Sequence, residues 1–279
     1  MQEISWKDNL RVAWFGSFLT GASISLVVPF MPIFVEQLGI EGDQVAFYAG
    51  LAISVSAVSA ALVSPIWGIL ADKYGRKPMM VRAGLAMTIT MGGLAFVPNI
   101  HWLLFMRLLN GVFTGFVPNA TALIASQVPK DKSGAALGTL STGVVAGTLT
   151  GPFVGGFIAE IFGIRNVFLL VGAFLFLAAI LTIFFIKEDF QPVAKEKAIP
   201  TKEVFSSFKY PRLLVNLFLT SFVIQFSAQS IGPILALYVR DLGQSENLLL
   251  VSGLIVSSMG FSSMMSAGVL GKFGDKVGN

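Results

Sequence analysis

Apolar residues occur along the chain in long runs, separated by short charged or glycine-containing stretches. Each run is close to the ~20 residues that an α-helix needs to cross about 30 Å of hydrocarbon. Gly and Pro within the runs are compatible with membrane helices, because neighbouring helices satisfy the freed backbone groups. The pattern predicts an all-α membrane protein with eight spans. We expect these spans over 11–35, 45–70, 79–98, 102–125, 135–159, 166–186, 212–239 and 247–271.

One long stretch between the runs, 187–210, is charged rather than apolar. It separates six predicted spans from two, and we interpret it as a cytoplasmic linker. The chain then divides into an N-terminal six-helix half over 1–186, the linker, and the first two helices of a second half over 211–279.

An internal repeat supports this division. A shift of 203 residues aligns Asp72 with Asp275, and a shift of 204 aligns Pro29 with Pro233. Parallel repeats of this kind are typical of two-halved transporters, whose site lies between the halves. Because the second copy ends after two spans, we expect about four further helices to be absent from this chain.

Charge gives the chain an orientation. Only 12% of the residues are charged, against roughly 25% in soluble domains. Of the 19 Lys and Arg residues, 16 lie at the ends and loops of one side, two lie on the other, and one lies inside a span. Cytoplasmic loops carry such an excess, so we expect both termini in the cytoplasm of a cell with this protein in its plasma membrane. Because the basic residues lie between spans, the net charge of +4 does not indicate nucleic-acid binding.

The sequence lacks the residues that several kinds of catalytic, metal-binding and ATP-binding site require. With no Cys and a single His, the chain has neither a thiol nucleophile nor the usual ligands of a metal site. No nucleophile motif, carboxylate pair or Walker loop is present. We therefore expect neither an enzyme nor an ATP-driven pump, and no cofactor or metal.

The loop after the second predicted span contains Gly68, Asp72, Gly75, Arg76 and Lys77. Gly68 permits close helix approach, Asp72 can cap a helix or pair with a cation, and Gly75 permits a tight turn. By themselves these residues fit a positively charged cytoplasmic loop with a turn. The segment also resembles the signature loop of the major facilitator superfamily, G-x-L-A-D-[RK]-x-G-R-[RK], with a reduced copy at 271–278. The resemblance implies a major-facilitator helical bundle, of which this chain contains one complete six-helix half and the first two helices of the second half. It also implies that Asp72 and Arg76 hold the cytoplasmic helix ends together in one access state.

Glycines line one face of the fifth predicted span. Residues four apart share a helix face, so such a row forms a groove for another helix, as in small-xxx-small packing. Spacing alone is equally compatible with generic helix packing. The stretch also resembles the G-x-x-x-G-P-x-x-G-G motif of drug/proton antiporters in this superfamily. The residues concerned are Gly143, Gly147, Gly151, Pro152, Gly155 and Gly156.

Arg107 lies within the fourth predicted span, where a cation costs at least ~2.5 kcal/mol on insertion scales. It either faces the bundle interior or extends to the head groups. With Asn110 and Gly111 it resembles the family's R-x-x-Q-G motif, with Asn in place of Gln, which implies a role in proton coupling. Pro29 and Pro32 in the first span resemble the paired prolines of twelve-span drug exporters.

Aromatic and amide residues are candidates for a substrate cavity, because they suit lipophilic and often cationic molecules. The two glutamines are equally suited to bonding adjacent helices. No Asp or Glu lies near the middle of a predicted span, so Glu36, Glu160, Asp241, Asp72 or a residue in the absent helices would carry the proton. The cavity candidates are Phe113, Phe116, Asn119, Phe222, Gln225, Phe226 and Gln229.

The resemblance extends over essentially the whole chain and is greatest to multidrug exporters of Gram-positive bacteria. It implies a monomeric secondary transporter in the lipid bilayer that exports small lipophilic or cationic drugs, driven by the proton gradient. Two alternatives remain at this point: an exporter of sugars or other metabolites with the same fold, and an inactive fragment that lacks its last four helices.

Overall fold

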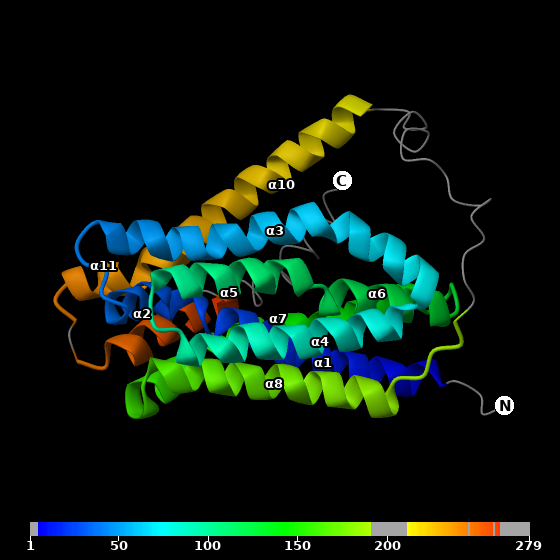
Figure 1. Cartoon of the computed structure of the whole chain (residues 1–279). Coiled ribbons are helices and arrows are strands. Elements are labelled where there is room, and N and C mark those ends of the chain that lie inside the picture. The colour runs from blue at the N-terminus through cyan, green and yellow to red at the C-terminus, as the bar shows by residue number, and fades with distance from the viewer. Residues whose placement is uncertain (1–4, 191–210, 245, 259, 263–279) are drawn as a thin grey trace.

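The computed structural model describes residues 5–190, 211–244, 246–258 and 260–262, and this part of the chain is helical without strands (Figure 1). Its first span consists of α1 (Trp6–Ser25), the 3-10 helix η1 (Val28–Phe30) and α2 (Met31–Gln37). The Ser5 side chain caps α1 by accepting a hydrogen bond from the Asp8 amide. Pro29 and Pro32 have no amide hydrogen, so they interrupt the helical hydrogen bonds and explain the break.

Five more helical segments complete the first bundle. They are α3 (Gln44–Tyr74), α4 (Arg76–Gly92) with η2 (Gly93–Phe96), α5 (Ile100–Phe113) with α6 (Phe116–Gln127), α7 (Ser133–Phe162) and α8 (Ile164–Phe185). Together with the first span, six segments of the described chain are long and apolar enough to cross a bilayer. This confirms the predicted all-α membrane fold. The fourth span, predicted as one helix, is broken between α5 and α6, where Gly115 has φ +134°.

Helices α4 and α8 pack with very little space between their backbones. A Cβ placed on Gly84 of α4 would lie 2.9 Å from Cβ of Ala179 in α8, and Gly92 lies against Gly172 of the same two helices. Larger side chains fill two buried clusters, one around Phe34 and Phe168, whose ring centroids are 4.6 Å apart, and one around Phe116. Apolar side chains on the outside of α3, α7 and α8 are exposed, as expected for surfaces that face lipid.

The chain resumes with α10 (Pro211–Ile231), η4 (Gly232–Ile234) and α11 (Leu235–Asp241), followed by a helix over Leu248–Ser262. The η4–α11 pair repeats η1–α2 with a shift of 204 residues, and the glycines that follow both have positive φ, +86° at Gly39 and +92° at Gly243. The sequence repeat therefore reappears in the backbone. Parts of the predicted linker (191–210), of the eighth span (263–271) and of the loop copy (271–278) lie outside the described residues.

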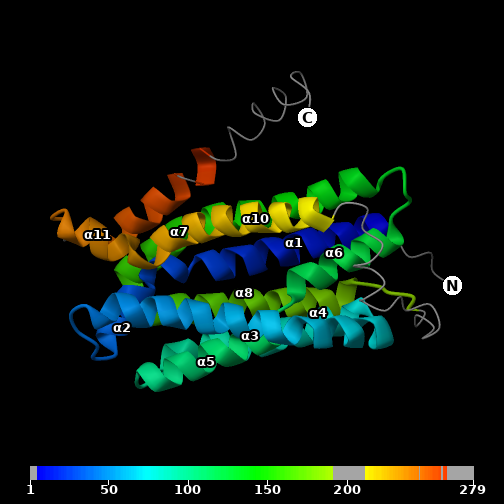
Figure 2. The same cartoon turned by 90° about the horizontal axis from the view of Figure 1, so that it is seen from above.

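The segments before and after the linker meet at one end of the molecule. There η4 and α11 contact η1 and α2, and η4 also contacts α3. Toward the opposite end, α10 leaves the bundle (Figure 1), and its side chains from 215 to 227 are exposed. The helix over Leu248–Ser262 lies beside α7 (Figure 2), with Gly253 against Pro152 and Gly260 against Leu149. The structure is thus closed at the end that carries Gly39 and Gly243, and open at the end where α1 begins.

Candidate functional site

The predicted loop forms a tight connection between α3 and α4. Asp72 in the last turn of α3 makes an ion pair with Arg76, the first residue of α4. Between them Gly75 has φ +101°, a conformation that side chains with a Cβ rarely adopt. The turn therefore needs glycine at this position, and it places a carboxylate and a guanidinium at the surface of the open end.

Glu188, three residues after the end of α8, completes the loop. Its two carboxylate oxygens accept hydrogen bonds from the backbone amides of Arg76 at 2.8 Å and Lys77 at 2.7 Å, so the carboxylate caps the N-terminus of α4. A Cβ on Gly75 would lie 2.8 Å from Glu188 Oε2, which is a second reason for glycine there. Sequence reasoning missed Glu188, because its only signal is its place at the end of the sixth apolar run.

The neighbouring backbone ties the same end of the bundle together. The Asn9 side chain of α1 donates to the Lys187 carbonyl at 2.6 Å and accepts from the Lys187 amide at 2.9 Å. Gln127, at the end of α6, donates to the same carbonyl at 3.0 Å. A surface cavity of about 370 Å³ lies beside these groups and is lined in part by Asp72, Arg76 and Glu188. The loop, α1, α6 and α8 therefore form one connected cluster.

The glycine face of α7 packs directly on α1. A Cβ on Gly143 would lie 2.6 Å from the Trp14 carbonyl oxygen, and one on Gly147 would lie 2.7 Å from the Ala22 nitrogen. At Gly151 a Cβ would lie 2.8 Å from the Ala22 oxygen. These neighbours are backbone atoms, which cannot rotate away. Gly155 lies against the side chains of Leu26 and Phe30 in the first span, with a Cβ there 2.7 Å from the Leu26 side chain and 3.0 Å from the Leu26 carbonyl oxygen.

A second face of α7 contacts the segment after the linker. A Cβ on Gly156 would lie 2.6 Å from the Leu249 oxygen, and one on Gly253 would lie 3.0 Å from the Pro152 carbonyl carbon. The predicted groove thus holds two helices, with Gly143, Gly147, Gly151 and Gly155 toward α1, and Pro152 and Gly156 toward the helix over Leu248–Ser262.

Arg107 is buried inside the bundle, with 6% of its surface exposed, and does not extend to the head groups. Its Nε donates to the Ala52 carbonyl at 3.2 Å and its Nη1 lies 3.5 Å from the Met91 sulfur. It forms no ion pair with any described residue. One turn away, the Asn110 amide links α3 and α4, accepting from Ser56 at 3.3 Å and donating to Thr90 at 3.2 Å. A buried cation therefore sits in a neutral polar cluster.

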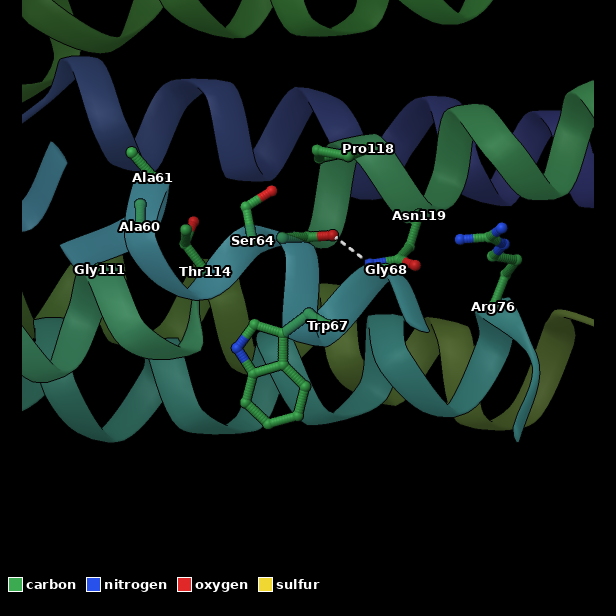
Figure 3. A pocket seen from close by; sticks show the side chains of 11 residues that line it. Ala60, Ala61, Ser64, Trp67, Gly68, Arg76, Gly111, Thr114, Pro118 and Asn119 are labelled. Carbon is green, nitrogen blue, oxygen red and sulfur yellow. Dashed lines mark hydrogen bonds between the residues drawn. The ribbon is translucent and has the colours of Figure 1, made fainter. Parts of the chain in front are cut away.

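A cavity of about 350 Å³ lies between α3, the start of α4 and the break between α5 and α6 (Figure 3). Asn119, Trp67 and Thr114 line it, and the Asn119 amide donates to the Gly115 carbonyl at 2.7 Å. The guanidinium of Arg82 stacks on the Trp67 ring, with its carbon 3.4 Å from the centroid, and donates to the Thr114 carbonyl at 3.2 Å. Neither Trp67 nor Arg82 was predicted as a site residue. Arg82 follows other loop cations in the sequence and was interpreted only as part of the charge asymmetry that sets the orientation.

The cavity candidates do not come together in this structure. Asn119 lines the cavity and Phe113 lies beside it, with its ring centroid 6.3 Å from that of Trp67. Phe116 is instead in the core, 1% exposed, against Gly16 of α1. On α10, the rings of Phe222 and Phe226 stack 6.0 Å apart and are exposed, as is Gln225. The Gln229 side chain lies outside the described residues.

Residues 13–279 match the Major Facilitator Superfamily. The chain belongs to this family. Its members are transporters, which agrees with the multi-pass helical bundle and confirms the resemblance in the sequence. Solved structures with this fold include a D-xylose–proton symporter, at 15% identity and TM-score 0.73 over 98% of this chain and 70% of that one. They also include the human organic anion transporter MFSD10, at 17% identity and TM-score 0.69 over 92% and 70%.

Curated relatives are much closer in sequence. The chain is 88% identical over its whole length to the multi-drug resistance efflux pump PmrA of Streptococcus pneumoniae, of which it covers 70%. It is 53% identical to a PmrA homolog of Lactococcus lactis, over 99% of this chain and 68% of that protein. It is 49% identical to the multidrug resistance protein MdtG of Klebsiella pneumoniae, over 99% and 67%. This family member is therefore similar to proteins named as drug efflux pumps over nearly all of its sequence.

Proposed function

We propose that the chain is a drug-exporting member of the superfamily, which moves small hydrophobic or cationic molecules outward in exchange for protons. The observation that carries this proposal is the 88% identity over the whole chain to a protein named a multi-drug resistance efflux pump. The α7 glycine face adds support, because the antiporter-like motif forms the tight contacts with α1 that its spacing predicts.

The orientation belongs to the same proposal. The 16-to-2 distribution of Lys and Arg favours both termini of the chain in the cytoplasm and a location in the plasma membrane. The loop cluster of Asp72, Arg76 and Glu188 then lies on the cytoplasmic side, where it would bias the access states, and the closed end of the structure faces outward. We assign the buried Arg107 a role in coupling to protons, because a cation without a carboxylate partner among the described residues responds strongly to a proton or substrate charge nearby.

The test compares two forms of the protein in cells that lack their own efflux pumps. One is the chain alone. The other, called here the extended chain, is residues 1–279 joined to the remaining C-terminal part of the pneumococcal relative. We expect the extended chain to lower the retention of ethidium, a lipophilic cation, and a protonophore to abolish the effect. Unchanged ethidium retention with correctly inserted protein would contradict the proposal. Activity of the extended chain only would assign the chain alone to the inactive alternative.

A further inference from the structure

Glu36 and Arg240 form an ion pair at the closed end of the molecule. Glu36 is near the end of α2 and Arg240 near the end of α11. Arg240 Nη1 lies 2.8 Å from Glu36 Oε2, and Nη2 lies 2.8 Å from Oε1, so the contact has the two-pronged geometry in which Arg binds a carboxylate best. Among the described residues, no other ion pair joins the part before the linker to the part after it.

The two residues occupy equivalent positions in the internal repeat. The shift of 204 residues that relates η1–α2 to η4–α11 also relates position 36 to position 240. Where two copies of a unit meet around an approximate two-fold axis, a position close to the axis faces its own counterpart, and the contact between positions 36 and 240 is of this kind. Equal residues there would bring like charges together and repel. This chain has opposite charges at the two positions, so the contact between its two copies becomes attractive.

The ion pair lies where the two parts touch, away from where they separate. At this end η4 and α11 contact η1 and α2, and Gly232 lies against Val28. Toward the other end α10 leaves the bundle (Figure 1). In a transporter that exposes its site alternately to either side, opening this end must draw position 36 away from position 240. The ion pair therefore exists in one access state and is broken in the other.

We infer that Glu36 and Arg240 form an external gate, an ion pair that stabilises the outward-closed state and must break before a substrate leaves. That this gate faces outward rests on the orientation given under the proposed function. The ion pair itself does not depend on that orientation. An interaction present in only one of two states shifts their equilibrium by its full free energy. Both side chains are partly exposed, 44% for Arg240 and 28% for Glu36, so solvent screens the pair. We expect its loss to lower the ratio of closed to open molecules about five-fold, which is about 1 kcal/mol at 1.4 kcal/mol per tenfold change.

The test measures distances across this end by spin labelling of the extended chain. The chain has no Cys, so Cys introduced at the exposed positions Glu41 and Glu246 would be the only label sites in residues 1–279. Any Cys in the added C-terminal part would first be replaced. We expect Glu36→Arg to increase the long-distance population at least five-fold, because it replaces attraction with repulsion. The exchange Glu36→Arg with Arg240→Glu should restore the original distances, which a merely misfolded single variant would not allow.

A matched control is Glu160→Arg, the same charge change at an exposed position of α7 near the same end, where Glu160 forms no ion pair with another described residue. We expect this control to leave the distances unchanged. The inference is wrong if Glu36→Arg leaves the distances as they were, if the exchange fails to restore them, or if Glu160→Arg moves them equally. These outcomes do not depend on drug export: distances that respond without ethidium export would contradict the proposed function alone, and export without a distance response would contradict the gate alone.

Discussion

Replacing Gly147 by Ala tests the close contact between α1 and α7. The added Cβ would lie 2.7 Å from the Ala22 nitrogen and closer still to the Phe18 carbonyl oxygen, both of them backbone atoms of α1. An ordinary contact of a Cβ needs roughly 3.4 Å or more, so α1 and α7 must separate by about 0.7 Å at the Ala22 nitrogen and by more at the Phe18 oxygen. Overpacking of this kind costs about 1–3 kcal/mol. The gain of about 1 kcal/mol for Gly→Ala in a helix offsets part of that cost.

The control removes the helix-propensity contribution. Gly138 lies on the same helix, and a Cβ there would have no atom within 4 Å. Gly138→Ala therefore gains the same propensity without the clash, and the difference between the two variants is the packing cost alone. In thermal unfolding of the purified extended chain, we expect the melting temperature of Gly147→Ala to lie roughly 2–10 °C below that of Gly138→Ala. Equal melting temperatures would refute the close contact, and with it the structural basis of the antiporter-like motif. Gly151→Leu, a larger insertion on the same face, should abolish ethidium export while the protein still inserts.

Three further predictions concern the cytoplasmic cluster and the orientation. Asp72→Asn removes the ion pair with Arg76, which is present in this cytoplasm-open arrangement, and should lower export turnover more than drug affinity, with a shift away from cytoplasm-open molecules in distance measurements; unchanged distances and rates would make Asp72 an ordinary loop charge. Glu188→Gln should destabilise the protein by about 1–2 kcal/mol through loss of the α4 cap, whereas Asp189→Asn, beside it and exposed, should not; equal effects on melting temperature would contradict the cap. A Cys at Glu41 should react with an impermeant maleimide in intact cells and a Cys at Lys197 should not, and the reverse labelling would overturn the orientation.

Much of the fold could be predicted because membrane helices depend on long apolar runs, a local property of the sequence. The predicted spans over 45–70 and 166–186 correspond to α3 and α8 with ends within a few residues. The turn at Gly75 was also predictable, since glycine tolerates the positive φ found there. The break at Gly115 was not, because glycine inside an apolar run is common in membrane helices and does not by itself end one.

The parts of the site that escaped prediction are contacts between residues distant in sequence. Glu188 caps a helix that begins 112 residues earlier, and Arg240 pairs with a carboxylate 204 residues away. Neither partner can be read from local spacing. Phe116 shows the converse: an aromatic residue in a central span suggested a cavity wall, and the close approach of Gly16 instead places it in the core. The internal repeat was the one sequence signal that related distant positions; its shift of 204 residues also relates position 36 to position 240, although the sequence alone does not show that the two side chains pair.

The most direct test of proton-coupled drug export uses the purified extended chain in sealed liposomes with an acidic lumen and a trapped pH-sensitive dye. When ethidium is added outside, we expect it to accumulate inside while the lumen becomes more alkaline, because each exchange carries protons outward. Collapsing the pH gradient beforehand should stop both signals, and liposomes without protein should show neither. Ethidium accumulation with no drug-dependent change in lumenal pH, or a complete absence of ethidium movement in liposomes that contain the folded protein, would contradict the account.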